Sequence, residues 1–304
     1  MSAGCARGLS YFLIPLCMLA PFSKAPVNVL FTGEGAITSA TPAGDVSVDT
    51  VRAAILPLYA HFGISNNIDI RILRRSAPDA DGKGGTGEVQ FTFGHQIRLP
   101  KTVQILDEGK VRRVRGVAYS TGVSAANNAR MIEAARGVLN PLAMDTYINS
   151  DVSSAPWVTV GGNGLPETRR RAGVGFGISL VAESNTGSLY SADLASPVAG
   201  GQPPEDVGRS CAFQLLECVA VGGCVSRIGA PTVLTLMAMG SEDVGRVLLS
   251  KEVIASEEIV NLAKDLRSMG ASSWGMREED DEESDYAIVS VVGRGIGNVG
   301  RKIA

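Results

Sequence analysis

The chain has 304 residues, of which 45% are hydrophobic and 19% charged, which excludes disorder throughout and allows one large core or two moderate ones. Its formal net charge is −3, but Glu278–Asp285 alone holds seven carboxylates, and the rest of the chain has a balance of +4. Such an acidic run cannot be buried, so we expect a solvated loop, with a functional acidic arm as the alternative. The mildly basic remainder permits RNA contact without requiring it.

The first hydrophobic segment, Leu9–Ala20, is a mostly apolar run behind Arg7, as in a secretory signal peptide. Pro15 within the run and the lack of a clear small-residue cleavage site argue against that alternative. The run is also shorter than the ~20 apolar residues that span a bilayer. We expect a buried strand here.

The next part of the chain predicts a β-α-β-β unit whose sheet is covered by a helix on one face. The expected elements are a strand at Val27–Thr32, a helix at Val48–Phe62 capped by Asp45, Ser47 or Asp49, and strands at Ile68–Leu73 and Val89–Phe93.

A strand and an amphipathic helix are predicted in the middle of the chain. The β-branched and aromatic residues of Val117–Thr121 are typical of a strand, which Gly122 ends. Ser124 can accept a hydrogen bond from the first turn of the helix that follows. Apolar residues then recur at three- and four-residue steps up to Leu139, and the polar face carries Arg130, Glu133 and Arg136.

The C-terminal part repeats this alternation of helices and strands. The expected elements are a helix at Glu205–Val221, a strand at Thr232–Met239, a helix at Glu257–Met269 capped by Ser256, and a strand at Tyr286–Val292. The recurrence predicts an α/β fold of the α+β type, built from repeated βα units.

Five segments together resemble one known family. They are LAPFSK (Leu19–Lys24), GGTGEV (Gly84–Val89), VRGVAYSTGVSAANNARMIEAARGVL (Val114–Leu139), GFGISLVAES (Gly175–Ser184) and RKIA (Arg301–Ala304). The third resembles the opening of the insert domain in the RNA 3′-terminal phosphate cyclase superfamily, specifically its eukaryotic cyclase-like branch. The resemblance runs from about Tyr11 to the last residue, and the five segments occur in the family's order.

The resemblance implies a larger domain of βα repeats, residues 1–108 and 201–304, with sheets covered by helices, interrupted by a smaller α/β insert at 109–200. The Gly- and Pro-rich stretch Ser196–Pro204 suits a linker at the end of the insert. Family members carry a further repeat before LAPFSK, and here about ten unrelated residues stand in its place. We expect an uncovered apolar face and sheet edge, which favour aggregation or a partner; a truncated gene model is the alternative.

True cyclases of this superfamily form a covalent nucleotide intermediate on a histidine near the C-terminus. The only histidines here are His61 and His95, and the corresponding region, Val247–Ile259, contains none. His61 lies at the end of a predicted helix, where a cation would favour the C-terminal dipole, and His95 follows a strand as a turn residue. We therefore expect no cyclase activity, no cofactor and no metal.

The five cysteines, without a CxxC pair, indicate neither a disulfide framework nor a zinc site, and Cys211 and Cys218 are expected to be buried.

A phosphate-binding loop is one interpretation of GGTGEV. Backbone N–H groups around Gly85, Gly87 and Glu88 could surround a phosphate together with the cations Arg74, Arg75 and Lys83. A Gly-rich hairpin with solvated basic flanks explains the same residues equally well.

Other cationic groups are candidates for RNA contact. Arg112, Arg113 and Arg115 near Lys110, the run Arg169–Arg171, and the tail residues Arg294, Arg301 and Lys302 could meet an RNA backbone or an acidic partner. Aromatic residues are rarely interleaved with them, which argues against base stacking. Lys264, Asp265 and Arg267 lie within one predicted helical turn and could supply metal-independent RNA cleavage, although surface salt bridging explains this trio more simply.

The resemblance implies a ribosome-biogenesis factor of the nucleus and nucleolus, acting in early processing of the small-subunit (18S) rRNA precursor. The implied partners are a large ribosome-assembly GTPase, the small-subunit processome with its small nucleolar ribonucleoprotein, and the pre-rRNA; no membrane is implied. Two rivals remain, an endoribonuclease that cleaves pre-rRNA and an active RNA 3′-phosphate cyclase, the latter disfavoured by the missing C-terminal histidine.

Overall fold

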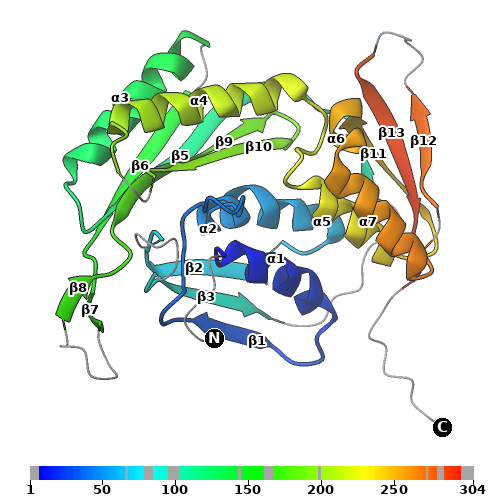
Figure 1. The fold of residues 1–304 in the computed structure, drawn as a ribbon. Coiled ribbons are helices and arrows are strands. Elements are labelled where there is room, and N and C mark those ends of the chain that lie inside the picture. The colour runs from blue at the N-terminus through cyan, green and yellow to red at the C-terminus, as the bar shows by residue number, and fades with distance from the viewer. Residues whose placement is uncertain are drawn as a thin grey trace.

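The computed structural model describes residues 7–65, 68–78, 85–94, 103–142, 145–160, 168–197, 200–271, 273–278 and 284–295. Within them the chain forms a mixed α/β fold with a three-stranded sheet, two four-stranded sheets and a two-stranded hairpin (Figure 1). The predicted fold class is confirmed.

The predicted β-α-β-β unit is present. It comprises β1 (Val27–Phe31), a helical run from α2 (Val48–Thr50) through a π turn (Val51–Ile55) and a 3-10 turn (Leu56–Phe62), then β2 (Ile68–Arg74) and β3 (Glu88–Phe93). The three strands are antiparallel in the order β1-β3-β2. Alternate residues of β3, Val89, Phe91 and Phe93, are buried under the helical run.

Two residues explain the form of that helical run. Ser47 caps it, because its hydroxyl oxygen accepts a hydrogen bond from the N–H of Thr50 at 3.1 Å. Pro57 lies at the start of the 3-10 turn, where its missing N–H cannot continue the α-helical hydrogen-bond pattern. The run ends at Gly63, which has a φ of 75°.

The expectation of a strand at Leu9–Ala20 is wrong. The segment forms helix α1 (Ser10–Leu19) followed by a 3-10 turn (Ala20–Phe22), with Pro15 inside the helix. Leu13 and Cys17, one helical turn apart, are fully buried in the large core. A run in which nearly every residue is apolar has no period of its own, so packing decides between helix and strand.

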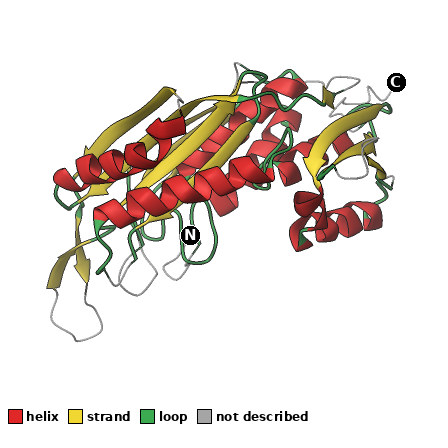
Figure 2. Cartoon of the chain, turned by 90° about the horizontal axis from the view of Figure 1, so that it is seen from above, coloured by secondary structure: helices red, strands yellow, loops and turns green. Residues whose placement is uncertain are grey.

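The second sheet has the order β10-β9-β5-β6. Its strands are β5 (Val111–Thr121), β6 (Asp145–Ser153), β9 (Gly175–Ser184) and β10 (Leu189–Ala195). β5 and β6 are parallel and joined by helix α3 (Ala126–Leu139) and a 3-10 turn at Asn140–Leu142, whereas the other pairs are antiparallel. α3 and α4 (Pro204–Val221) lie side by side over one face of this sheet (Figure 2).

The predicted strand and helix of this region are confirmed. The Ser124 hydroxyl accepts a hydrogen bond from the N–H of Ala126 at 3.3 Å, as expected for the helix start. Met131, Ala135 and Leu139 are fully buried, while Arg130 is exposed. The amphipathic pattern therefore corresponds to a helix lying on a sheet.

Helix α4 belongs spatially to this sheet. It begins after residue 200, where the insert was expected to end, yet it contacts α3, β9 and β10. Gly208 allows the close approach of the two helices, because a Cβ there would lie 2.3 Å from the carbonyl oxygen of Met131. The boundary at 109–200 stays a prediction.

The third sheet has the order β12-β13-β11-β4. Its strands are β4 (Gln104–Ile105), β11 (Val244–Ser250), β12 (Gly275–Glu278) and β13 (Tyr286–Val292), and its helices are α5 (Ala230–Met239), α6 (Lys251–Ala255) and α7 (Glu257–Ser268). The strand at Tyr286–Val292 and the helices beginning at Pro204 and Glu257 agree with the predictions. Ser256 takes the N-cap position of α7, but its hydroxyl donates to the carbonyl of Val253 and does not cap the helix.

The strand predicted at Thr232–Met239 is wrong, because these residues form helix α5. Leu234, Leu236 and Met237 are all buried, so the helix is apolar on most sides and its sequence shows no helical period. The strand of this region is β11, directly after α5.

One side chain joins the two places where the chain enters and leaves the second sheet with its helices. The Tyr190 hydroxyl lies 2.8 Å from the Glu108 carboxylate, just before β5, and 2.8 Å from the carbonyl oxygen of Gly223, just after α4.

Among the described helices, none combines the length and apolarity needed to cross a bilayer.

Candidate functional site

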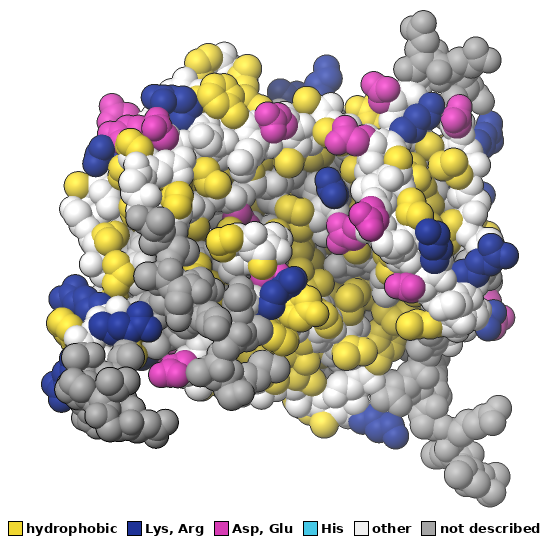
Figure 3. Space-filling view, viewed as in Figure 1, with side chains coloured by type: hydrophobic (Ala, Val, Ile, Leu, Met, Phe, Trp, Pro, Cys, Tyr) yellow, Lys and Arg dark blue, Asp and Glu magenta, His cyan; other side chains and the backbone are white. Residues whose placement is uncertain are grey.

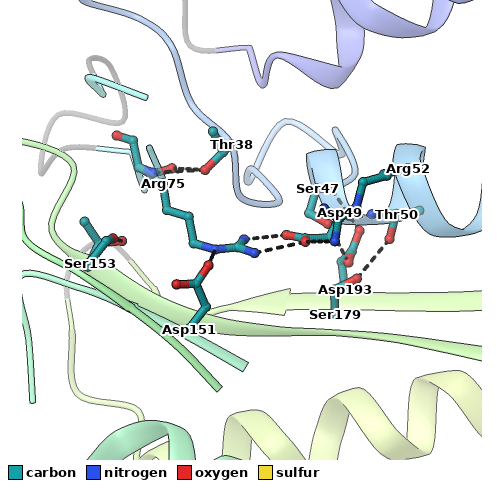
Figure 4. A network of polar contacts seen from close by, with 12 residues as sticks. Thr38, Ser47, Asp49, Thr50, Arg52, Arg75, Asp151, Ser153, Ser179 and Asp193 are labelled. Carbon is teal, nitrogen blue, oxygen red and sulfur yellow. Dashed lines mark hydrogen bonds and ion pairs between the residues drawn. The ribbon is translucent and has the colours of Figure 1, made fainter. Parts of the chain in front are cut away.

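A buried ion-pair network lies between the helical run and the second sheet (Figure 4). Arg75, in the segment after β2, donates two hydrogen bonds to Asp49 of α2, at 2.5 and 3.1 Å. Its Nε donates to Asp151 of β6 at 2.6 Å. The Arg75 side chain is only 6% exposed, so a single guanidinium ties α2 to the second sheet.

The surroundings of Arg75 keep it charged. Burial lowers the pKa of Arg75, but the hydrogen bonds and charges of Asp49 and Asp151 more than offset this and raise it above the ordinary value. The guanidinium carbon also lies 5.1 Å from the centre of the Tyr119 ring. Arg75 is therefore a permanent cation whose donors are directed at protein carboxylates.

A second carboxylate at the same interface is Asp193 of β10. It accepts hydrogen bonds from the N–H of Ser47 at 2.8 Å and from the Ser47 hydroxyl at 2.9 Å, and next to it the hydroxyls of Thr50 and Ser179 lie 3.3 Å apart. Burial raises the pKa of Asp193, and these hydrogen bonds oppose the rise. Ser47 thus both caps the helical run and attaches it to the sheet.

The Gly-rich loop packs against the segments that follow β1 and β2. The N–H of Thr86 donates to the Ser76 hydroxyl at 2.9 Å, and the N–H of Gly87 donates to the carbonyl of Ala36 at 2.8 Å. A Cβ on Gly87 would lie 2.6 Å from that carbonyl oxygen, and one on Gly85 would lie 2.9 Å from Ile37. In this conformation the N–H groups of Thr86 and Gly87 are used by hydrogen bonds within the protein, and Gly85 and Gly87 allow the close packing of the loop.

The predicted phosphate-binding cations occupy different places. Arg74 pairs with Glu88 across β2 and β3 at 2.9 Å, next to Gly87, while Arg75 points into the interior toward Asp49 and Asp151. Lys83 lies outside the described residues. Asp151 and Asp193 were missed in the sequence analysis and Asp49 was considered only as a helix cap, because only the fold brings Asp49 and Asp151 to Arg75 and Asp193 to Ser47. Phosphate binding by the loop stays a prediction.

The cations of β5 lie at the exposed start of the strand. Arg113 donates to Glu183 of β9 at 2.5 and 2.8 Å, and Arg115 donates to Asp145 of β6 at 2.6 Å. Hydrogen bonding with Glu183 raises the pKa of Arg113. Arg112 is exposed and has no ion pair with any carboxylate of the described residues. Two of the three predicted RNA contacts therefore have carboxylate partners within the sheet, and RNA contact by this cluster stays a prediction.

Lys264, Asp265 and Arg267 are all exposed on helix α7. In a helix, residues three apart such as Lys264 and Arg267 point in a similar direction. Asp265, one residue from Lys264 and two from Arg267, points in a different direction. No ion pair joins the three in the part of the chain that the structure describes. Their role in cleavage stays a prediction.

The region expected to hold a cyclase nucleophile forms the end of β11, helix α6 and the start of α7. His61 lies in the 3-10 turn before Gly63, and burial lowers its pKa, so the neutral form is favoured where a cation was expected. His95 lies outside the described residues. Cys17, Cys211 and Cys224 are buried and Cys218 is partly buried. Within the described ranges no three His, Cys, Asp or Glu residues form a metal-binding group.

Comparison with known proteins agrees with the resemblance noted in the sequence. The insert domain of RNA 3′-terminal phosphate cyclase matches residues 106–220. The rRNA processing protein rcl1 of Schizosaccharomyces pombe is 36% identical over 98% of this chain and 75% of its own length. The RNA 3′-terminal phosphate cyclase-like protein of Mus musculus is 36% identical, and the rRNA processing protein RCL1 of Saccharomyces cerevisiae 30%, with the same shares of each chain covered. This chain therefore belongs to the RNA 3′-terminal phosphate cyclase-like family.

Proposed function

We propose that this chain is a ribosome-biogenesis factor without cyclase activity, acting in early nucleolar processing of the small-subunit (18S) rRNA precursor. The observation that carries the proposal is identity of 30–36% over nearly the whole chain with relatives named rRNA processing proteins. The absence of any histidine after His95 supports the loss of cyclase chemistry, because the nucleotide-accepting imidazole has no equivalent in this sequence. Its role would be to bind RNA and a large GTPase partner within the small-subunit processome.

Complementation tests the proposal. Cells depleted of their own cyclase-like protein would receive this chain, and pulse-labelled rRNA would show whether 18S precursors mature. We expect restored processing and nucleolar localisation. Unprocessed precursor in the presence of well-expressed, folded protein would contradict the proposal.

The two rival activities are separated by direct assays. Incubation with precursor RNA, using Asp265→Ala and Lys264→Ala as controls, reports endoribonuclease activity; cleavage lost in both variants would support that rival. Labelled ATP reports cyclase chemistry, and we expect no covalent adduct on this chain. A stable adduct would contradict the argument from the missing histidine.

A further inference from the structure

A two-stranded hairpin extends from the second sheet beyond the end of β6. It consists of β7 (Trp157–Val160) and β8 (Thr168–Arg171), which pair antiparallel (Figure 1). At its base Ala155 and Ala172 are buried, and the N–H of Ala172 donates to the carbonyl of Pro156 at 3.0 Å. These contacts anchor the hairpin, since two isolated strands are only marginally stable in water.

The register of the hairpin places an aromatic ring and two cations on one face. Trp157 lies directly opposite Arg171, and Thr159 lies opposite Arg169. Because side chains alternate along a strand, Trp157, Arg169 and Arg171 share a face, and Arg170 opposite Val158 lies on the other. Lys and Arg side chains gather over the hairpin at the left of the space-filling view (Figure 3).

Trp157 is unusually accessible. Its side chain is 64% exposed, although tryptophan is among the residues most buried on average. The guanidinium carbon of Arg171 lies 5.3 Å from the ring centre, in cation–π contact. The contact fixes the orientation of the ring and leaves most of its surface in solvent.

Within the described ranges, the two arginines on the Trp157 face have no carboxylate partner. Both Arg169 and Arg171 are exposed. A ligand for this face therefore has to offer negative charge and a flat π surface together. Single-stranded RNA does so, because its phosphates pair with arginine and its bases stack on aromatic rings and guanidinium planes.

We propose that the Trp157 face of this hairpin binds single-stranded RNA, with a base stacked on Trp157 and phosphates held by Arg169 and Arg171. Duplex RNA fits less well, since its bases are stacked within the helix, and an acidic polypeptide would use the arginines without the ring. The proposal deepens the proposed function in rRNA processing, on which it rests. It also revises the expectation that base stacking is absent, which arose because Trp157 and Arg171 are brought together only by the hairpin.

Intrinsic fluorescence gives a direct test, because the chain has only two tryptophans. In a full-length Trp274→Phe variant the emission comes from Trp157 alone. We expect titration with a mixed-sequence single-stranded RNA to quench this emission, and the duplex of the same sequence to bind more weakly. In the wild-type background Trp157→Ala should weaken binding by about tenfold, the range expected for loss of one base stack, while Trp157→Phe should retain most of it.

The arginines are tested through the salt dependence of binding. Removing two phosphate contacts in the double variant Arg169→Gln, Arg171→Gln should reduce the slope of log affinity against log salt by about 1.4. Matched controls are Arg246→Gln, an exposed strand arginine elsewhere, and Phe213→Ala, an aromatic that is 49% exposed on α4. Neither control should change RNA affinity.

Three results would overturn the hairpin proposal. They are equal binding of duplex and single strand, an effect of Trp157→Ala no larger than that of Phe213→Ala, and equally effective competition by polyglutamate, which would indicate an acidic protein partner. Complementation separates this proposal from the proposed function. Restored 18S maturation without RNA binding by the hairpin removes the hairpin proposal alone, whereas RNA binding without restored maturation removes the rRNA-processing role.

Discussion

Arg75 and Asp49 form a two-hydrogen-bond ion pair in the interior, with both side chains almost fully removed from solvent. We expect Asp49→Ala to lower the free energy of unfolding by about 3–5 kcal/mol, because it leaves a buried guanidinium with Asp151 as its remaining partner. Denaturant unfolding measures this change.

The exposed pair of Arg71 and Asp69, 2.8 Å apart, provides the control. Asp69→Ala should lower the free energy of unfolding by no more than about 1 kcal/mol, because solvent screens exposed charges. Equal losses of unfolding free energy for Asp49→Ala and Asp69→Ala would show that the buried Arg75–Asp49 pair stabilises the fold no more than an exposed pair does.

Two glycines should respond oppositely to alanine. Gly87→Ala would place a Cβ 2.6 Å from the Ala36 carbonyl oxygen and 2.8 Å from Thr38, so we expect destabilisation of about 1–3 kcal/mol from forced backbone shifts. A Cβ added to Gly137, within α3, would meet no atom of the described residues within 4 Å, so Gly137→Ala should stabilise the helix by up to about 1 kcal/mol. Thermal unfolding compares them, and a stabilised Gly87→Ala variant would contradict the close packing of the loop.

Two buried tyrosines form a second matched pair. The Tyr59 hydroxyl has no hydrogen-bond partner among the described residues, whereas that of Tyr190 lies against Glu108 and Gly223. We expect Tyr59→Phe to leave stability unchanged or raise it by about 1 kcal/mol, because a buried polar group without a partner is removed. Tyr190→Phe should lower stability by about 1–2 kcal/mol. Urea unfolding measures the stability of both variants. Equal changes for Tyr59→Phe and Tyr190→Phe would contradict the difference in hydrogen bonding.

Asp193 predicts a pH dependence. Burial raises its pKa in the folded state above the ordinary value of 3.8, so the folded protein holds this proton to higher pH than the unfolded chain does. Its contribution to stability is therefore fully present below the unfolded pKa and is lost as the pH rises through the folded pKa. Asp193→Asn removes the titration, so its stability relative to wild type should increase with pH across that window and then level off.

Urea unfolding from about pH 3 to about pH 7 checks this prediction. Asp69→Asn is the control, since that carboxylate is exposed. A stability difference between Asp193→Asn and wild type that stays constant with pH would contradict the assigned burial of the charge.

The elements that could be predicted from sequence are those with a clear period or cap. The strand at Tyr286–Val292, the helix starting near Ser124 and the Ser47 cap each follow from residues close together in the chain. The segments Leu9–Ala20 and Thr232–Met239 were assigned wrongly as strands, because both are mostly apolar and their form depends on the core around them.

The candidate site was less predictable for a related reason. Neighbouring arginines such as Arg74 and Arg75 look alike in sequence, yet one pairs with Glu88 near the surface and the other is enclosed by Asp49 and Asp151. The carboxylates that decide this difference come from α2 and β6, far from Arg75 along the chain. Opposition of Trp157 and Arg171 likewise depends on a hairpin register that no local motif encodes.

The contacts of Tyr190 with Glu108 and Gly223 bring together the two places where the main chain enters the second sheet and leaves helix α4. A unit that is entered and left at one point can be acquired, exchanged or discarded by a single genetic event, and the flanking chain keeps its path. The phenol of Tyr190 thus marks the junction at which the second sheet and its helices meet the rest of the chain.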